Sequence, residues 1–296
     1  MKLSILTATY NRAEFLEKLY KSIINNLDSR LEIEWLIMDD GSEDNTKEVV
    51  QKFIDEQKVE IKYYKQKNQG KMAAINNLMQ YVTGDLIVDC DSDDYFATNA
   101  FEKIKEQFEN TDKQSLYAIC FLKQNENGQI DGTRFKNRTS TMFDLYFKEG
   151  TTGEKNLVYY AEVRKKYKHE LENGEKFITE ARMYNKMDEQ YKIKCVNEPI
   201  IIGDYQANGY TSNILKTFKT SPYGYLKYFE EILQKDFKGV TWNKRLYAIK
   251  HYILFLTLTK EKLKLKKVKN LLNKILLILL YIPGRIKSKI LLIKLI

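Results

Sequence analysis

Short apolar runs alternate with longer amphipathic stretches through the first half of the chain. The apolar runs at 3–8, 34–38, 59–64 and 85–90 have the length of buried strands. The stretches at 13–26, 45–57 and 71–82 carry apolar residues at helical spacing, and Asn11 is placed to cap the first of them. This alternation is typical of βαβ units, so it predicts a largely parallel sheet flanked by helices.

The pattern is weaker in the second half. It predicts helices at 100–110 and 177–188, strands at 116–122, 158–161 and 193–202, and irregular chain between a turn at Asn127-Gly128 and about residue 153. A chain of 296 residues is long enough for one large α/β domain and an appendage. We therefore expect one large domain and a smaller tail, with a helical region at 216–296.

Carboxylates gather after two of the predicted strands. The run DSDD at 91–94 follows one strand, and DDGSED at 39–44 follows another. Ligands of open α/β sheets bind at the carboxyl ends of the strands, so both clusters can share one crevice. Clustered carboxylates repel unless cations or hydrogen-bond donors lie among them, and Mg²⁺ or Mn²⁺ is a simple partner. The alternative is a pair of acidic turns that cap the following helices.

A third polar segment, NQGK at 68–71, opens the predicted helix at 71–82. Backbone N–H groups at a helix N-terminus, together with Lys71, suit a diphosphate. A single Gly-Lys pair is weak evidence, because an ordinary surface lysine gives the same pattern. The segment gains meaning only together with the carboxylates.

Four segments, taken in order, resemble the family 2 glycosyltransferases of the GT-A fold. They are SILTATYNR at 4–12, DDGSEDNT at 39–46, NQGK at 68–71 and DSDD at 91–94. The resemblance implies a Rossmann-like nucleotide-diphospho-sugar transferase fold at 1–215, with a donor half at 1–95, an acceptor half at 96–215 and a C-terminal helical extension. It also implies inverting transfer from a nucleoside-diphosphate sugar, most often a UDP-sugar, without a covalent enzyme intermediate.

The resemblance implies a role for individual residues by their position in these segments. The residues implied to bind the donor are Ala8, Tyr10, Arg12, Asp39, Asp40, Lys71 and Asp91. Among them, Ala8, Tyr10 and Asp40 would contact the nucleoside, and Asp91 would lie on the ribose side. Asp93 would hold the metal, Mn²⁺ or Mg²⁺.

The resemblance also implies a carboxylate base in the second half, and Glu180 is the candidate. Glu175 lies five residues earlier, and a helix with about 100° per residue would turn it well away from the face of Glu180. The structural alternative for Glu180 is a solvated helix carboxylate. The segment 204–212 resembles the part of the family fold that closes the acceptor side.

The C-terminal tail is the basic part of the chain. Residues 260–296 carry ten lysines and one arginine against one acid, which is +10, whereas the whole chain carries +9, so residues 1–259 carry −1. A helical apolar seam runs through Leu265, Val268, Leu272, Ile275, Leu279 and Ile282, and a second piece follows Pro283-Gly284. The uncharged stretch 275–284 is about half of the roughly 20 residues that a spanning helix needs. We expect a basic amphipathic helix on an anionic membrane surface, with packing on the catalytic domain or a dimer partner as the alternative.

Two other classes of function fit parts of the chain. A nucleotidyltransferase also needs strand-end acids and a metal, but residues 7–12 lack the glycine-rich loop expected there. The basic tail would suit a nucleic-acid-binding protein, but the net charge of −1 on residues 1–259 argues against nucleic acid as a partner. Three cysteines without a CxxC pair, and no export signal, predict a cytoplasmic protein. We expect it at the inner face of a bacterial plasma membrane, with a growing, lipid-linked or surface glycan as acceptor.

Overall fold

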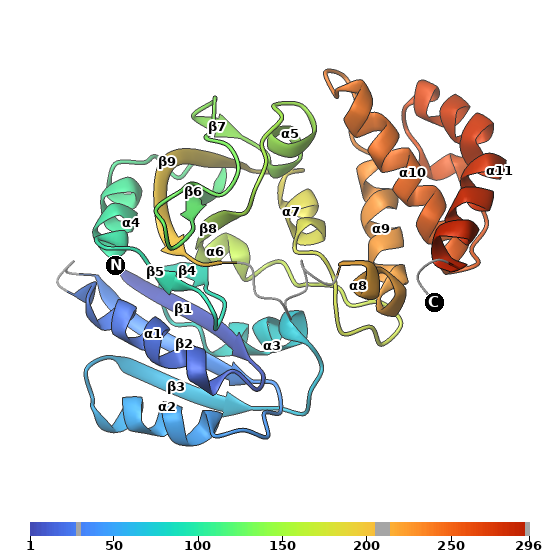
Figure 1. The fold of residues 1–296 in the computed structure, drawn as a ribbon. Coiled ribbons are helices and arrows are strands. Elements are labelled where there is room, and N and C mark those ends of the chain that lie inside the picture. The colour runs from blue at the N-terminus through green and yellow to red at the C-terminus, as the bar shows by residue number, and fades with distance from the viewer. Residues whose placement is uncertain (28–30, 205–213, 294–296) are drawn as a thin grey trace. The chain divides into compact units, whose positions relative to one another are not determined.

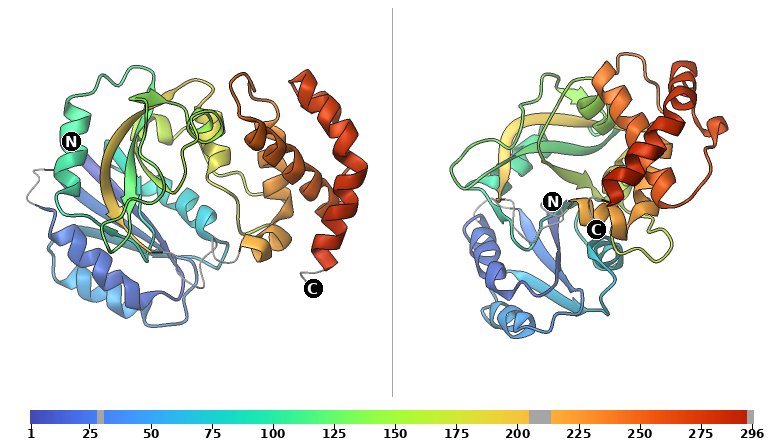
Figure 2. Two further views of the ribbon diagram at one scale, coloured as in Figure 1. Left: turned by 45° about the horizontal axis from the view of Figure 1, so that its top comes forward. Right: turned by 45° about the vertical axis from the view of Figure 1, so that its right-hand side comes forward.

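A computed structural model describes residues 1–27, 31–204 and 214–293, with side chains described to residue 288 (Figures 1 and 2). The strands are β1 Lys2–Thr9, β2 Glu32–Asp39, β3 Glu60–Lys65, β4 Leu86–Asp89, β5 Tyr95–Phe96, β6 Leu116–Gln124, β7 Thr139–Ser140, β8 Lys155–Tyr160 and β9 Lys192–Ile202. The helices are α1 Ala13–Ile24, α2 Thr46–Asp55, α3 Lys71–Leu78, α4 Ala100–Glu109, α5 Met142–Phe147, α6 Ala161–Arg164, α7 Ala181–Met187, α8 Ile214–Thr220, α9 Pro222–Ile232, α10 Trp242–Leu258 and α11 Leu271–Ile293.

The strands form one mixed sheet in the order β3-β2-β1-β4-β8-β6-β9-β5, with β7 paired to β9. The first four strands of this order are parallel, and β8 runs antiparallel to both β4 and β6. Right-handed crossovers put α1 and α2 on one face of the sheet (Figures 1 and 2). The strand order reverses after β3, so the next crossover puts α3 on the other face. The predicted α/β sheet is confirmed.

The centre of this sheet is covered on both faces, which explains its uninterrupted apolar runs. Leu3, Ile5 and Leu6 of β1 have no exposed surface, and the same holds for Trp35 of β2. Trp35 stacks against rings from α1 and α2, Tyr20 and Phe53. These aromatic contacts fix the two helices on β2, and so fix the loops that precede them.

The structure corrects three local predictions. Asn11 does not cap α1. Its side chain instead accepts from Glu43 N at 2.8 Å. The carboxylate of Asp44 accepts from the backbone N–H of Ala13, the first residue of α1, at 3.1 Å. The segment expected to be irregular contains α5, because Thr141 caps it and Asp188 accepts from its first two backbone N–H groups. The helix predicted at 177–188 is shorter, since α7 begins at Ala181.

The chain divides into two compact units, each described by itself. The first is Met1–Lys168 with Met187–Asp204, and it contains the sheet. The second joins His169–Lys186 to the helices α8 to α11. The expected boundary at residue 215 stays a prediction, and it differs from this division in placing His169–Lys186 with the first domain.

The tail is part of the second unit, where α11 lies along α10 (Figure 1). Leu277 is fully buried, and Gly284 approaches Ile253 so closely that an added Cβ would lie 3.0 Å from it. The expected break at Pro283 is wrong, because α11 runs through it. Among the described residues no helix combines the length and the apolar character needed to cross a membrane.

Candidate active site

Three neighbouring parallel strands end at one edge of the sheet. Thr9 of β1 lies opposite Asp39 of β2, and Leu6 of β1 lies opposite Asp89 of β4. The two acidic clusters therefore start from adjacent strand ends on either side of β1, as the sequence predicts. Between them lie the end of β1, where Ala8 is half-buried, and the loop after it, where Tyr10 is 45% exposed.

Asp39 and Asp40 are buried, and their oxygens organise the loops around them. Asp39 accepts from Ser42 N at 2.6 Å, which closes the turn, and from the hydroxyl of Tyr63. Asp40 accepts from Gln69 N at 2.8 Å and from Gly70 N at 2.7 Å. Asp40 thus draws the 66–70 loop onto the end of β2, directly before α3.

Gly70 is required at this position for a backbone reason. Its φ of +94° lies in the left-handed region, which glycine adopts without strain. That conformation turns its N–H toward Asp40 and starts α3 at Lys71. Lys71 then forms an ion pair with Asp91 at 2.6 Å, from the end of β4.

Each carboxylate of the DSDD run is paired with a cation of the protein. Lys71 binds Asp91, Arg12 binds Asp93 at 2.6 Å, and Lys123 binds Asp94 at 2.7 Å. Protein cations therefore supply the neutralisation that the clustered acids require, and a metal is not needed for it. Arg12 and Lys71 are also the cations expected to meet the donor, and their side chains are 29% and 24% exposed.

Lys123 is a site-edge residue that the sequence did not reveal. It projects from β6, its side chain is 11% exposed, and it binds Glu154 at 3.0 Å as well as Asp94. Burial raises the pKa of Asp94 to about 7, although Lys123 opposes the rise. Burial alone would lower the pKa of Lys123, but the two carboxylates outweigh it and raise this pKa. We conclude that Lys123 is charged and fixes Asp94 away from solvent.

The three carboxylates do not form a ready metal cage. Within the described ranges, no group of three or more His, Cys, Asp or Glu side chains is arranged to hold a metal ion. A divalent cation bound through one carboxylate plus substrate phosphates needs no such cage. Asp93, with 14% of its side chain exposed, fits that single-ligand role when Arg12 moves to another anion.

Glu180 lies in the second unit, immediately before α7. Its backbone carbonyl accepts from Met183 N at 2.9 Å, and its carboxylate accepts from the Tyr184 hydroxyl at 2.8 Å. Glu175 is not on a helix with it, so the argument from about 100° per residue does not apply.

The nearby acids have structural roles. Glu175 accepts from two backbone N–H groups at the start of α9, and Asp188 caps α5. Glu180 therefore stays the predicted base, because the carboxylates of Glu175 and Asp188 are each bound to the start of a helix. The segment predicted to close the acceptor side, 204–212, lies outside the described residues except for Asp204.

The part of the chain that contains the sheet-edge segments matches a known protein family. The model of the family described as glycosyl transferase family 2 matches residues 4–170, more than half of the chain. This chain belongs to glycosyl transferase family 2. The match contains all four motif segments and ends at residue 170, ten residues before Glu180.

One similar protein is named for the reaction that it catalyses. The GalNAc(5)-diNAcBac-PP-undecaprenol beta-1,3-glucosyltransferase of Campylobacter jejuni is 32% identical over 128 residues, which cover 43% of this chain and 40% of that protein. The chain spans half or less of the length of the curated relatives that it matches.

Solved structures with a similar fold align with nearly the whole chain. TarS 1-349 of S. aureus in complex with UDP-GlcNAc covers 91% of this chain and 82% of its own, with a TM-score of 0.57 and 17% identity. The mannosyltransferase PcManGT of Pyrobaculum calidifontis, in complex with GDP-Man and Mn²⁺, covers 97% and 83%, with a TM-score of 0.57 and 13% identity. The predicted GT-A fold of this family member is confirmed.

Proposed function

We propose that the chain is an inverting, metal-dependent glycosyltransferase that uses a UDP-sugar. One observation carries the proposal: the ends of β1 and β4 and the start of α3 bring two cations and two acids together at one sheet edge, as the pairs Arg12–Asp93 and Lys71–Asp91. A nucleoside diphosphate needs cations for its phosphates and acceptors for its ribose, and this edge has both. Support for the nucleotide comes from TarS 1-349, whose structure is a complex with UDP-GlcNAc.

Binding of the donor would break these two ion pairs, because its phosphates would replace the carboxylates as partners of the cations. Its diphosphate would draw Arg12 and Lys71, leaving Asp91 for the ribose side and Asp93 for the metal. The half-buried Ala8 and the exposed Tyr10 would contact the nucleoside beside the loop that Asp40 holds. Asp39 would support them by closing the turn after β2.

Asp93 would be the protein ligand of Mn²⁺ or Mg²⁺, with phosphate oxygens and water as the remaining ligands. Such an ion supplies Lewis-acid stabilisation of the leaving diphosphate. Support for manganese comes from the Mn²⁺ in the PcManGT complex.

Glu180 would act as the general base. It would take the proton from an acceptor hydroxyl while that oxygen forms its bond to the anomeric carbon. The bond from this carbon to the diphosphate breaks on the opposite face, and its electron pair leaves with UDP. General-base assistance is typically worth about 10²–10⁴-fold. Glu175, five residues earlier, binds the first turn of α9 with both carboxylate oxygens, which makes it the weaker candidate.

The acceptor would be a lipid-linked or surface glycan precursor at an anionic membrane. On α11 the residues Leu271, Leu272, Ile275, Ile278, Leu279, Ile282 and Ile286 are 42–71% exposed at helical spacing, and we call them the α11 stripe. Lys287 is exposed beside it, and Lys274 and Arg285 are half-exposed. A helix with such a stripe and flanking cations binds headgroup interfaces. The undecaprenol in the name of the Campylobacter relative supports a lipid-linked acceptor.

Nucleotide release from a panel of UDP-, GDP- and dTDP-sugars tests the proposal. We expect release of UDP, abolition by EDTA and recovery with Mn²⁺ or Mg²⁺. Asp93→Asn should remove activity, whereas Asp131→Asn, which changes an acid outside the strand-end cluster, should retain it. Pyrophosphate formation from a nucleoside triphosphate would instead identify a nucleotidyltransferase. Full activity in EDTA would reject the metal.

A further inference from the structure

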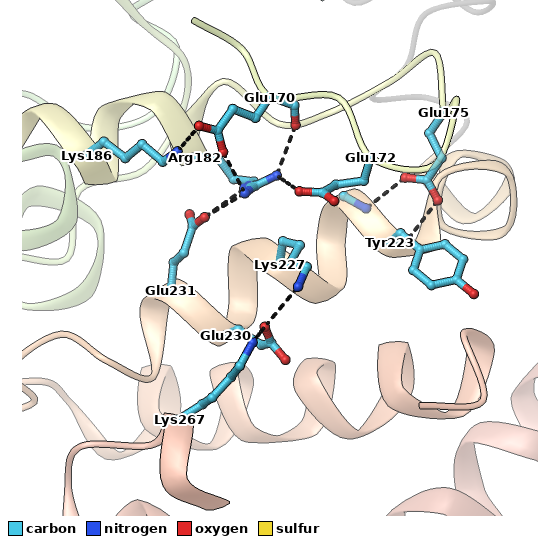
Figure 3. Close-up of polar contacts among 11 residues, drawn as sticks. Glu170, Glu172, Glu175, Arg182, Lys186, Tyr223, Lys227, Glu230, Glu231 and Lys267 are labelled. Carbon is cyan, nitrogen blue, oxygen red and sulfur yellow. Dashed lines mark hydrogen bonds and ion pairs between the residues drawn. The ribbon is translucent and has the colours of Figure 1, made fainter. Parts of the chain in front are cut away.

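Glu175 and Arg182, which lie on either side of Glu180 in the sequence, both bind α9, as Figure 3 shows for these two residues. On the C-terminal side, Arg182 donates to Glu231 of α9 from Nε at 2.9 Å and from Nη2 at 2.8 Å. The other guanidinium nitrogen donates to the carboxylate of Glu172 at 2.9 Å and to the carbonyl of Glu170 at 3.0 Å. Arg182 therefore ties the chain at 170–172 and helix α9 to the position two residues after Glu180.

On the N-terminal side, Glu175 reaches the start of α9. Its two carboxylate oxygens accept from Tyr223 N and Gly224 N, each at 2.7 Å (Figure 3). These are first-turn N–H groups that have no partner inside the helix. Gly224 leaves room for this contact, because an added Cβ would lie 3.2 Å from the Glu175 carboxylate. Glu175 thus pairs with the positive end of α9.

Burial makes the Arg182 connection rigid. The Arg182 side chain is 7% exposed and that of Glu231 is 23% exposed. Breaking a buried pair by removing one partner leaves an uncompensated charge, so the fold strongly favours the paired geometry. Arginine also fixes direction, because its planar guanidinium donates along set axes.

We propose that Arg182, Glu231 and Glu175 are positioning residues for Glu180, which fix it through α9. This inference rests on the proposed role of Glu180 as the general base. The two anchors lie five residues before and two residues after Glu180, so the short chain between them has little freedom to move the carboxylate. Positioning matters for catalysis because a displacement of about 1 Å can cost about 10²-fold in rate.

The adjacent residue of α9 offers a matched control. Glu230 is also buried, at 4% exposure, but it binds Lys227 at 3.6 Å and Lys267 at 2.6 Å and has no contact with Arg182 (Figure 3). Glu230→Gln and Glu231→Gln are the same substitution at neighbouring positions of one helix, where the Glu230 side chain is 4% exposed and that of Glu231 is 23% exposed. Only the second weakens the anchor beside Glu180.

The experiment measures transfer kinetics, UDP affinity and melting temperature of the full chain. Glu231→Gln should lower kcat by about tenfold or more, with the donor KM and UDP affinity within about twofold of wild type. Glu230→Gln should keep kcat within about twofold. In the Glu180→Gln background, Glu231→Gln should cause no further loss, because residues that act through one group are not additive.

The outcomes separate this inference from the function on which it rests. If Glu180→Gln transfers at the wild-type rate, the base assignment is wrong. If Glu180→Gln is slow while Glu231→Gln is as fast as Glu230→Gln, the base stands and the positioning role is wrong. Additive losses in the double variant would also overturn it. Should Glu231→Gln fail to fold, Glu175→Gln carries the same expectation at the other anchor.

Discussion

The α11 stripe provides the sharpest prediction about the membrane. Replacing Leu279 and Ile282 by serine removes two of its central side chains. They are 66% and 71% exposed, whereas the face of α11 against α10 is formed by residues such as Leu277 and Gly284. The double variant should therefore fold normally and change only the outward surface.

The loss in membrane affinity follows from the area involved. Full burial of a leucine or isoleucine side chain is worth about 1.5–3 kcal/mol, so burying two-thirds of each contributes roughly 2–4 kcal/mol together. That corresponds to roughly 30- to 800-fold weaker binding. Each cation near an anionic surface adds about 1 kcal/mol, so the double variant should keep a residual, salt-sensitive affinity.

Co-sedimentation with phosphatidylglycerol-containing vesicles measures this loss, with phosphatidylcholine vesicles for comparison. A matched control is Ile214→Ser with Leu215→Ser, which removes two comparably exposed apolar side chains, 38% and 43%, from α8. The control should bind as wild type. Equal binding by wild type and the α11 variant would refute membrane docking of the stripe.

Two further predictions concern stability. Burial acts to raise the pKa of Glu34, but hydrogen bonds from Ser4 and Thr83 outweigh it and lower this pKa to about 2, from 4.5. The stabilisation by the ionised Glu34 is therefore complete above pH 4.5 and is lost as pH falls toward about 2. Glu34→Gln should lower the free energy of unfolding in urea by about 1–3 kcal/mol at pH 7, and by less at pH 3. Lys123→Met should lose about 3–5 kcal/mol, with a smaller loss at pH 5 than at pH 8, because Lys123 opposes the rise in the pKa of Asp94 and without it the buried acid must at pH 8 either bind a proton or stay charged and unpaired.

The donor half was largely predictable because its signals are local. Each strand at 3–8, 34–38 and 85–90 is a contiguous apolar run followed at once by polar residues, and parallel strands deliver those residues to one edge. The partners of the acids were not predictable. Lys123 meets Asp94 only because β6 and β4 flank β8, and no local pattern specifies that order.

Helix ends in the second half depended on distant residues. Asp188 caps α5 from more than forty residues away, and Asp44 supplies the acceptor for Ala13 that Asn11 was expected to provide. Pro283 lies inside α11, where its position on the exposed surface tolerates the missing N–H bond. Tertiary contacts decided these cases where local propensity gave another answer.

The arrangement of the second unit determines which membrane experiment is meaningful. Removing 260–296 would take away Lys267, the cation bound to the buried Glu230, and would uncover Ile253, which Gly284 approaches. Both contacts lie in the second unit, which also contains the proposed base. A truncated chain that loses both vesicle binding and transfer would therefore not separate anchoring from catalysis. Substitutions on the outward stripe leave α9 and α10 covered, so a loss of vesicle binding with intact UDP release in solution would assign the stripe to the membrane alone.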